Sequence, residues 1–230
     1  MHSVIQNLSR KLVVSCQAPV DSPLHDPVVI AAIALASVEQ GAVAVRIDTP
    51  AHISAVREKV NLPIIGLWKQ KLPGFDVYIT PQFHHAAAIA EAGADIIAID
   101  ATQRNRPEGE TVTSLITRIH EELNKPVMAD VDTFEAACAA EKAGADLVAT
   151  TLYGYTPRTN HLNPPGFELL AQMVKKLEVP AICEGGISSP KMARRALDLG
   201  AYAVVVGTAI TGIDHQVKMY QQAIANPFES

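Results

Sequence analysis

The sequence predicts an α/β fold in which eight parallel strands close into a (β/α)8 barrel of the TIM type, surrounded by helices. A phrase beginning Gly-Ala recurs at intervals of roughly 50 residues, and a proline precedes an apolar run midway between its copies. Helical stretches separate the apolar runs. Strand–helix units of roughly 25 residues each are typical of a closed barrel, whereas an open doubly wound sheet usually has fewer strands.

The Gly-Ala phrase and the proline signal each mark strands. Copies of the phrase begin at Gly41, Gly93, Gly144 and Gly200. The glycine ends an Ala-rich helix in the left-handed conformation, and the apolar run behind it is typical of a buried parallel strand. Three further strands follow Pro63, Pro126 and Pro180, and the run Leu12–Gln17 supplies the first strand.

These signals place the elements in order. The strands are expected at about residues 12–17, 42–47, 64–68, 96–100, 127–130, 147–151, 181–184 and 203–207. The helices are expected near residues 27–40, 51–60, 82–92, 111–123, 132–143, 166–177, 189–199 and 215–225. With 230 residues, of which 48% are hydrophobic, the chain is long enough to bury one such core. We therefore expect a single catalytic domain over residues 1–230.

The composition excludes several classes of protein. The formal net charge is -5 and no dense basic run occurs, so we expect no nucleic-acid partner. No apolar run approaches the roughly 18 residues of a membrane span, and the start of the chain lacks a signal-peptide segment. Three widely spaced cysteines without a CxxC motif indicate free thiols in a reducing compartment. We expect a cytoplasmic protein with no membrane partner.

Polar or glycine residues end the predicted strands. These residues are Gln17, Arg46, Lys69, Asp100, Asp130, Thr150, Thr151, Glu184 and Gly207. In parallel barrels, catalytic groups lie at the carboxyl ends of the strands. Because a desolvated charge is costly unless it is paired or used, the pattern predicts a polar pocket at this end of the barrel.

Two glycine turns follow the seventh and eighth strands. They are Glu184-Gly185-Gly186 and Gly207-Thr208. Backbone N–H groups in such turns can approach an anion closely, and barrels commonly bind phosphate after these two strands. The turns therefore predict a phosphate site, the alternative being that the glycines serve only as tight turns.

Two residues are candidates for proton chemistry. Lys69 ends the third strand, and an amine partly desolvated near Arg46 would have a lowered pKa and serve as a proton base or a Schiff-base nucleophile. The alternative is an ordinary surface lysine. Glu184 follows an apolar strand directly, so burial should hold it near the substrate. Asp130 and Asp132 are not accompanied by a histidine cluster, so we predict no metal site.

Short segments in order over nearly the whole chain carry a resemblance to a known family. They are Val14–Gln17, Ala42–Ile47, Pro63–Gly66 with Lys69, Ala98–Ala101, Met128–Asp130, Thr150–Thr156 and Val205–Ile210. They resemble the N-acylglucosamine-6-phosphate 2-epimerase family, which interconverts N-acetylmannosamine 6-phosphate and N-acetylglucosamine 6-phosphate. The resemblance implies an isomerase that uses no metal or other cofactor, acting in sialic-acid or amino-sugar catabolism.

The resemblance also implies roles for individual residues. Lys69 and Glu184 would carry the proton chemistry. The sugar would be held by Gln17, Arg46, Asp130, Thr151 and Tyr155, and its phosphate by Gly185, Gly186, Gly207 and Thr208. The expected partners are a small-molecule sugar phosphate and a second copy of the chain, in a homodimer.

One departure from the family concerns the phosphate. Many family members resemble Glu-Gly-Arg where this chain has Glu184-Gly185-Gly186, so a cation is missing and Arg158 or Lys191 is expected to substitute. Two other functions stay open from the residues alone. One is a phosphate-binding barrel enzyme that uses Lys69 as a Schiff-base nucleophile, and the other is a sugar-phosphate-binding barrel without catalysis.

Overall fold

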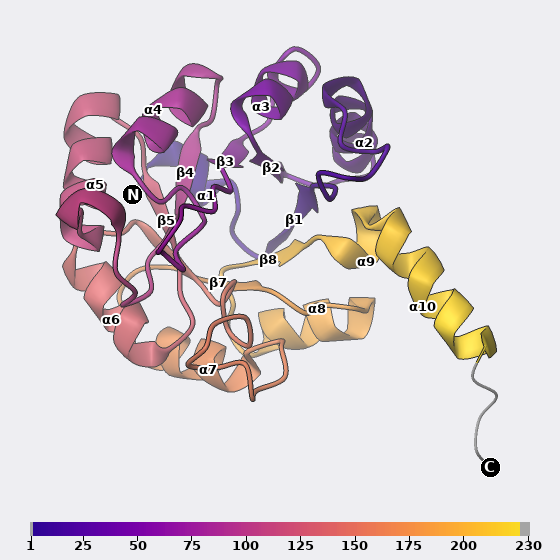
Figure 1. Cartoon of the computed structure of the whole chain (residues 1–230). Coiled ribbons are helices and arrows are strands. Elements are labelled where there is room, and N and C mark those ends of the chain that lie inside the picture. Colours follow the sequence, from indigo (N-terminus) through magenta and orange to yellow (C-terminus); the bar gives the residue numbers. More distant parts are fainter. Residues whose placement is uncertain (1, 226–230) are drawn as a thin grey trace.

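The computed structural model describes residues 2–225, and its eight parallel strands form a closed barrel in chain order (Figure 1). The strands are β1 (Lys11–Cys16), β2 (Ala44–Asp48), β3 (Ile64–Leu67), β4 (Ile96–Asp100), β5 (Val127–Asp130), β6 (Leu147–Ala149), β7 (Ala181–Glu184) and β8 (Ala203–Val206). β1 pairs with both β2 and β8, which closes the sheet. The predicted barrel and its eight strands are confirmed.

Helices α2–α8 surround the strands (Figure 1). They are α2 (Pro27–Glu39), α3 (Pro50–Arg57), α4 (Phe83–Glu91), α5 (Val112–Arg118), α6 (Phe134–Lys142), α7 (Phe167–Lys176) and α8 (Pro190–Asp198). A π-helical turn, η2 (Ile119–Leu123), extends α5, and α10 (Ile213–Ala225) ends the described chain. Three short helices, α1 (Ser3–Gln6), η1 (Pro107–Gly109) and α9 (Thr208–Thr211), were not expected from the sequence.

The sequence signals act as their chemistry suggests. The glycines that begin the four copies of the Gly-Ala motif have φ between 96° and 108°. This left-handed conformation suits glycine at a helix end. The prolines lie just before their strands, and the carbonyl of Pro63 accepts a hydrogen bond from Val45 of the preceding strand at 3.1 Å. Pro126 and Pro180 accept equivalent bonds. Proline is tolerated there because it starts the strand rather than interrupting it.

Alternate residues of each strand face the inside of the barrel. Ala44, Met128 and Ile182 belong to the buried cluster inside the barrel. The next residues on the same face are Arg46, Asp130 and Glu184, because strand side chains alternate with a period of two. Below them, Ile5 and Leu8 at the start of the chain belong to the same interior cluster. The alternation thus delivers polar side chains to one end of a closed, apolar barrel.

The flank of the barrel beside β8 is covered differently from the rest. α10 has no buried residues and leaves the barrel wall, as Figure 1 shows in yellow. An apolar groove of about 450 Å³ lies over β1 and β8, beside α8, and Leu12, Val204 and Leu197 are among its lining residues. Within residues 2–225, no helix is both long enough and apolar enough to cross a membrane.

Gly66 tests how tightly the helices pack on the strands. A Cβ atom on Gly66 would lie 2.5 Å from the Cβ of Ala94 and 3.0 Å from Cδ1 of Ile53. Gly66→Ala should therefore lower the free energy of unfolding by about 1–3 kcal/mol, measured by urea denaturation. Adding Ala94→Gly should recover part of this loss, since it removes the nearest atom. Independent, additive losses from the two substitutions would contradict this packing.

Candidate active site

The polar strand ends meet in a cavity with two adjoining lobes. The larger lobe has a volume of about 850 Å³ and lies at the ends of β1, β2 and β3. The second, which we call the glycine lobe, has a volume of about 480 Å³ and lies at the turns after β7 and β8. The residues that line both lobes are Ser15, Gln17, Lys69, Tyr78, Gly207, Thr208 and His215. A ligand with two polar ends can span both lobes across these shared residues.

A buried arginine joins two carboxylates across the barrel mouth. Arg46 on β2 donates through Nη1 to Oε1 of Glu184 on β7, and through Nη2 to Oδ2 of Asp130 on β5. Arg46 is 3% exposed and Asp130 is fully buried. Buried charges are tolerated only when they are paired with good geometry, so each member of this triad depends on the others.

The triad carries one carboxylate more than it has cations. Burial lowers the pKa of Arg46, but Asp130 and Glu184 outweigh this and raise it above its ordinary value, so the guanidinium stays charged. Burial raises the pKa of Asp130 to about 7; Arg46 opposes this rise and Glu184 adds to it. A proton on Asp130 would relieve the excess negative charge in this low-dielectric setting.

Lys69 lies just beyond β3, beside this triad. A β-bridge to Ile79 fixes its backbone, and its N–H donates to Oδ1 of Asp48 at 2.9 Å. Its Nζ donates to Oε1 of Gln17 and lies 3.8 Å from Oδ2 of Asp48. Burial lowers the pKa of Lys69, Asp48 opposes this change, and Arg46 adds to it. The amine is therefore biased toward its neutral, proton-accepting form.

The other predicted sugar-binding residues are distributed between the cavity wall and the layer behind it. Gln17 lines both lobes, and Thr151 and Tyr155 line the glycine lobe. Asp130 lines neither lobe. It accepts hydrogen bonds from Arg46 and, at 2.6 Å, from the hydroxyl of Thr151. Asp130 therefore contacts those two side chains rather than a ligand, and its charge acts on the cavity through space.

The predicted phosphate-binding residues come together in the glycine lobe, which Gly185, Gly186, Gly207 and Thr208 all line. Gly185 and Gly186 have φ values of 96° and 70°. A Cβ on Gly186 would lie 2.7 Å from Cβ of Pro164, so both backbone conformation and space favour glycine there. The backbone geometry explains the two glycines even without a ligand, and it also exposes main chain to the lobe.

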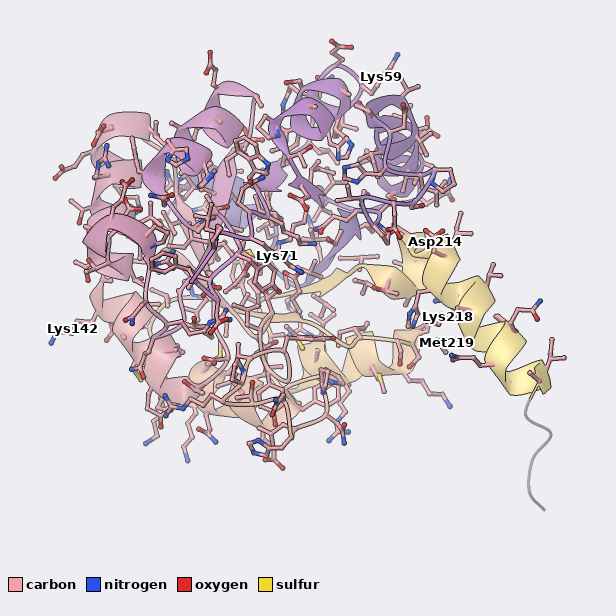
Figure 2. The ribbon with its side chains drawn as sticks, in the orientation of Figure 1. Lys59, Lys71, Lys142, Asp214, Lys218 and Met219 are labelled. Atoms are coloured by element: carbon pink, nitrogen blue, oxygen red, sulfur yellow. The ribbon has the colours of Figure 1, made fainter. Side chains whose placement is uncertain are left out.

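The cations expected to replace the missing arginine lie elsewhere. Arg158 donates to Gln103 at 2.9 Å and lies 3.6 Å from Glu135, and neither it nor Lys191 lines either lobe. Lys71 lines the larger lobe, and Figure 2 labels it over the barrel mouth. His215 at the start of α10 lines both lobes. Gln216 and Met219 of the same helix also line the glycine lobe.

The predictions from sequence did not include several polar residues that line the cavity, among them Ser15, Asp48, Tyr78 and His215. Ser15 and Asp48 lie on strands, and alternation from the inward-facing Val13 and Ala44 could have found them. Tyr78 lies in the loop between β3 and α4, and His215 lies on α10. No strand pattern marks either of them, because the loop and the helix bring them to the cavity from outside the barrel.

Comparisons with known proteins agree on one family. The family model NanE, described as "Putative N-acetylmannosamine-6-phosphate epimerase", matches residues 30–226. Several relatives carry the name "Putative N-acetylmannosamine-6-phosphate 2-epimerase", including one from Thermosynechococcus vestitus and one from Synechococcus elongatus. The one from Thermosynechococcus vestitus is 63% identical and covers 93% of this chain and 92% of its own length. The one from Synechococcus elongatus is 58% identical and covers 96% of each chain.

Solved structures give the same answer. The N-acetylmannosamine-6-phosphate 2-epimerase from Clostridium perfringens is 40% identical, with a TM-score of 0.92 over 96% of each chain. Thiamine phosphate pyrophosphorylase from Pyrococcus furiosus, at 18% identity and a TM-score of 0.60, shares the fold alone. The chain therefore belongs to the family of N-acetylmannosamine-6-phosphate epimerases.

Proposed function

We propose that this protein is an isomerase that inverts C2 of N-acetylmannosamine 6-phosphate to give N-acetylglucosamine 6-phosphate. One observation of the site carries the proposal. The amine of Lys69, biased toward its neutral form, lies at the junction of two lobes whose floor holds the Arg46–Glu184 pair. The relatives named for this reaction, and the family to which the chain belongs, support the choice of substrate.

The proposed reaction begins with ring opening. The C2 proton becomes acidic only when C1 is a free aldehyde, so the hexose ring must open first. Oε1 of Glu184 is committed to Arg46, whereas its buried Oε2 has no hydrogen-bond partner among residues 2–225. An unpaired buried carboxylate oxygen is costly, and a substrate hydroxyl would satisfy it. Glu184 thus assists ring opening through Oε2.

Lys69 then carries the C2 step. Neutral Nζ accepts the C2 proton and becomes an ammonium. The electron pair of the C–H bond forms a C1–C2 double bond, and the π electrons of the carbonyl move to the C1 oxygen. A proton returned to C2 on the opposite face restores the aldehyde and completes the inversion. Glu184 can supply this proton when it has taken up the C1 hydroxyl proton during ring opening. Lys69 can supply it only when the intermediate turns over or a substrate hydroxyl relays the proton.

The glycine lobe would hold the phosphate. Gly185, Gly186, Gly207 and Thr208 supply backbone groups there, and His215 adds an imidazole. A phosphate fixed at one end of an open-chain sugar keeps C2 in place during ring opening and closing. Gln17, Arg46, Thr151 and Tyr155 would contact the sugar itself. The resemblance further supports a cytoplasmic enzyme of sialic-acid or amino-sugar catabolism. In this proposal the chain forms a single catalytic domain, and its side chains transfer the protons without a cofactor.

The exposed face of α10 supports a homodimer. Ile213, Val217, Tyr220 and Ile224 lie along one side of the helix and are 54%, 55%, 70% and 75% exposed. Figure 2 shows Lys218 and Met219 on the same helix where it extends beyond the barrel. Within residues 2–225, no helix covers the apolar groove over β1 and β8. In the proposed dimer, the α10 stripe of each copy packs into that groove of the other copy.

Turnover gives the first test. Wild-type protein in deuterated water should convert N-acetylmannosamine 6-phosphate to N-acetylglucosamine 6-phosphate that carries deuterium at C2. Proton NMR measures both the conversion and the deuterium incorporation. Lys69→Ala should lower the rate at least about 100-fold while circular dichroism shows an intact fold. Ligand binding without turnover by the wild type would instead indicate a binding barrel. A substrate adduct trapped on Lys69 by borohydride would indicate Schiff-base chemistry.

The pH dependence gives a second test. Lys69 acts when neutral, so kcat/KM should fall as the pH drops through its pKa. Asp48 raises the pKa of Lys69, and Asp48→Asn removes that charge but keeps an oxygen for the Lys69 N–H. The acid limb of the profile should therefore move to lower pH. The surface variant Asp198→Asn should leave it in place. If the acid limb of the kcat/KM profile moves to higher pH in Asp48→Asn, or does not move, Lys69 is not the base that this limb reports.

Sedimentation gives the test of the dimer. Wild-type protein should sediment at twice the 24.6 kDa chain mass. Val217→Asp places a charge in the apolar stripe and should shift the protein toward the monomer. Gln222→Asp adds the same charge on the opposite side of α10 and should remain dimeric. A monomeric wild type, or dimerisation equally insensitive to both substitutions, would refute this interface.

A further inference from the structure

Tyr78 lies where the two lobes of the cavity meet. It lines both lobes, as Lys69 does. Its carbonyl accepts from the N–H of Gln70 at 2.8 Å, and Ile79, the next residue, pairs with Lys69 in a β-bridge. The same short ribbon therefore fixes Tyr78 and Lys69 relative to one another at the junction of the lobes.

The Tyr78 ring and its hydroxyl have different surroundings. The half-buried ring packs against the apolar cluster inside the barrel. The hydroxyl makes no hydrogen bond within residues 2–225, although it lies in the field of Asp130 and Arg46. Burial raises the pKa of Tyr78 to about 12, and the charge of Asp130 adds to this rise. The phenol is therefore neutral at physiological pH and has its O–H free to donate.

The proposed chemistry needs such a donor beside Lys69. When Lys69 takes the C2 proton, negative charge develops on the C1 oxygen. Two neighbouring donor groups already bind protein atoms: the Gln17 amide donates to the Ser15 hydroxyl at 2.7 Å, and both terminal nitrogens of Arg46 bind carboxylates. A donor aimed at developing charge accelerates a reaction because it is stronger in the transition state than in the ground state.

We propose that Tyr78 is a further catalytic residue whose hydroxyl donates a hydrogen bond to the C1 oxygen of the ring-opened sugar. This inference rests on the proposed epimerase function. The C2 proton goes to Nζ of Lys69, the C–H electron pair forms the C1–C2 double bond, and the carbonyl π pair goes to the C1 oxygen. The Tyr78 proton stays on the phenol throughout, so the residue stabilises the oxyanion without being consumed.

Tyr78→Phe tests this role because it removes only the oxygen and keeps the ring in its apolar site. For N-acetylmannosamine 6-phosphate, kcat should fall about 100-fold while KM changes less than about threefold. Deuterium exchange at C2, measured by NMR, should fall in parallel with kcat, and the melting temperature should stay within about 2 °C of the wild type. Site-specific 3-fluorotyrosine at position 78, which keeps the donor, should retain kcat within about threefold.

Tyr153→Phe is the matched control. Tyr153 packs against Gly166 and lines neither lobe, so loss of its hydroxyl should leave kcat unchanged. A kcat within about threefold of wild type in Tyr78→Phe, or a rise in KM without a fall in kcat, would overturn the proposal. Absence of epimerisation by the wild type is a different result, because it would overturn the proposed function before Tyr78 is tested.

Discussion

The site depends on one buried guanidinium shared by two carboxylates. Arg46 binds Asp130 and Glu184, and so joins β2, β5 and β7 across the barrel mouth. Removing Arg46 would leave two buried carboxylates without their cation, which typically costs several kcal/mol. The arrangement commits one oxygen of Glu184 and leaves the other, Oε2, without a partner among residues 2–225. The triad thereby sets the charge of the cavity floor and leaves a buried carboxylate oxygen that a substrate can engage.

The position of Lys69 follows from this floor. Its amine is held by Gln17 and Asp48 while burial and the nearby Arg46 charge favour loss of its proton. A base near the floor and glycine turns at the far side of the same cavity suit a substrate with a reacting centre at one end and an anion at the other. The barrel provides this separation because the strands that carry these groups lie at different points of one closed ring.

Much of this arrangement can be predicted from the sequence, for physical reasons. Helix-ending glycines and strand-opening prolines mark backbone states that few other residues adopt, so the strands fall within two residues of their expected ends. Strand alternation then brings Gln17, Arg46 and Glu184 to the cavity. The sequence does not reveal that Asp130 lies behind Arg46, since depth depends on packing across the barrel. Nor does it place Tyr78 or the outward path of α10, which depend on a loop and on contacts beyond local pattern.

We propose that the triad and the glycine turns together orient one sugar phosphate with C2 against Lys69. A crystal structure of Lys69→Ala bound to N-acetylmannosamine 6-phosphate tests it most directly. We expect the phosphate at the backbone of Gly186 and Gly207, with C2 facing the space vacated by the amine and a sugar oxygen within hydrogen-bond distance of Oε2 of Glu184. A phosphate bound in the larger lobe near Lys71, with C2 turned away from residue 69, would contradict it.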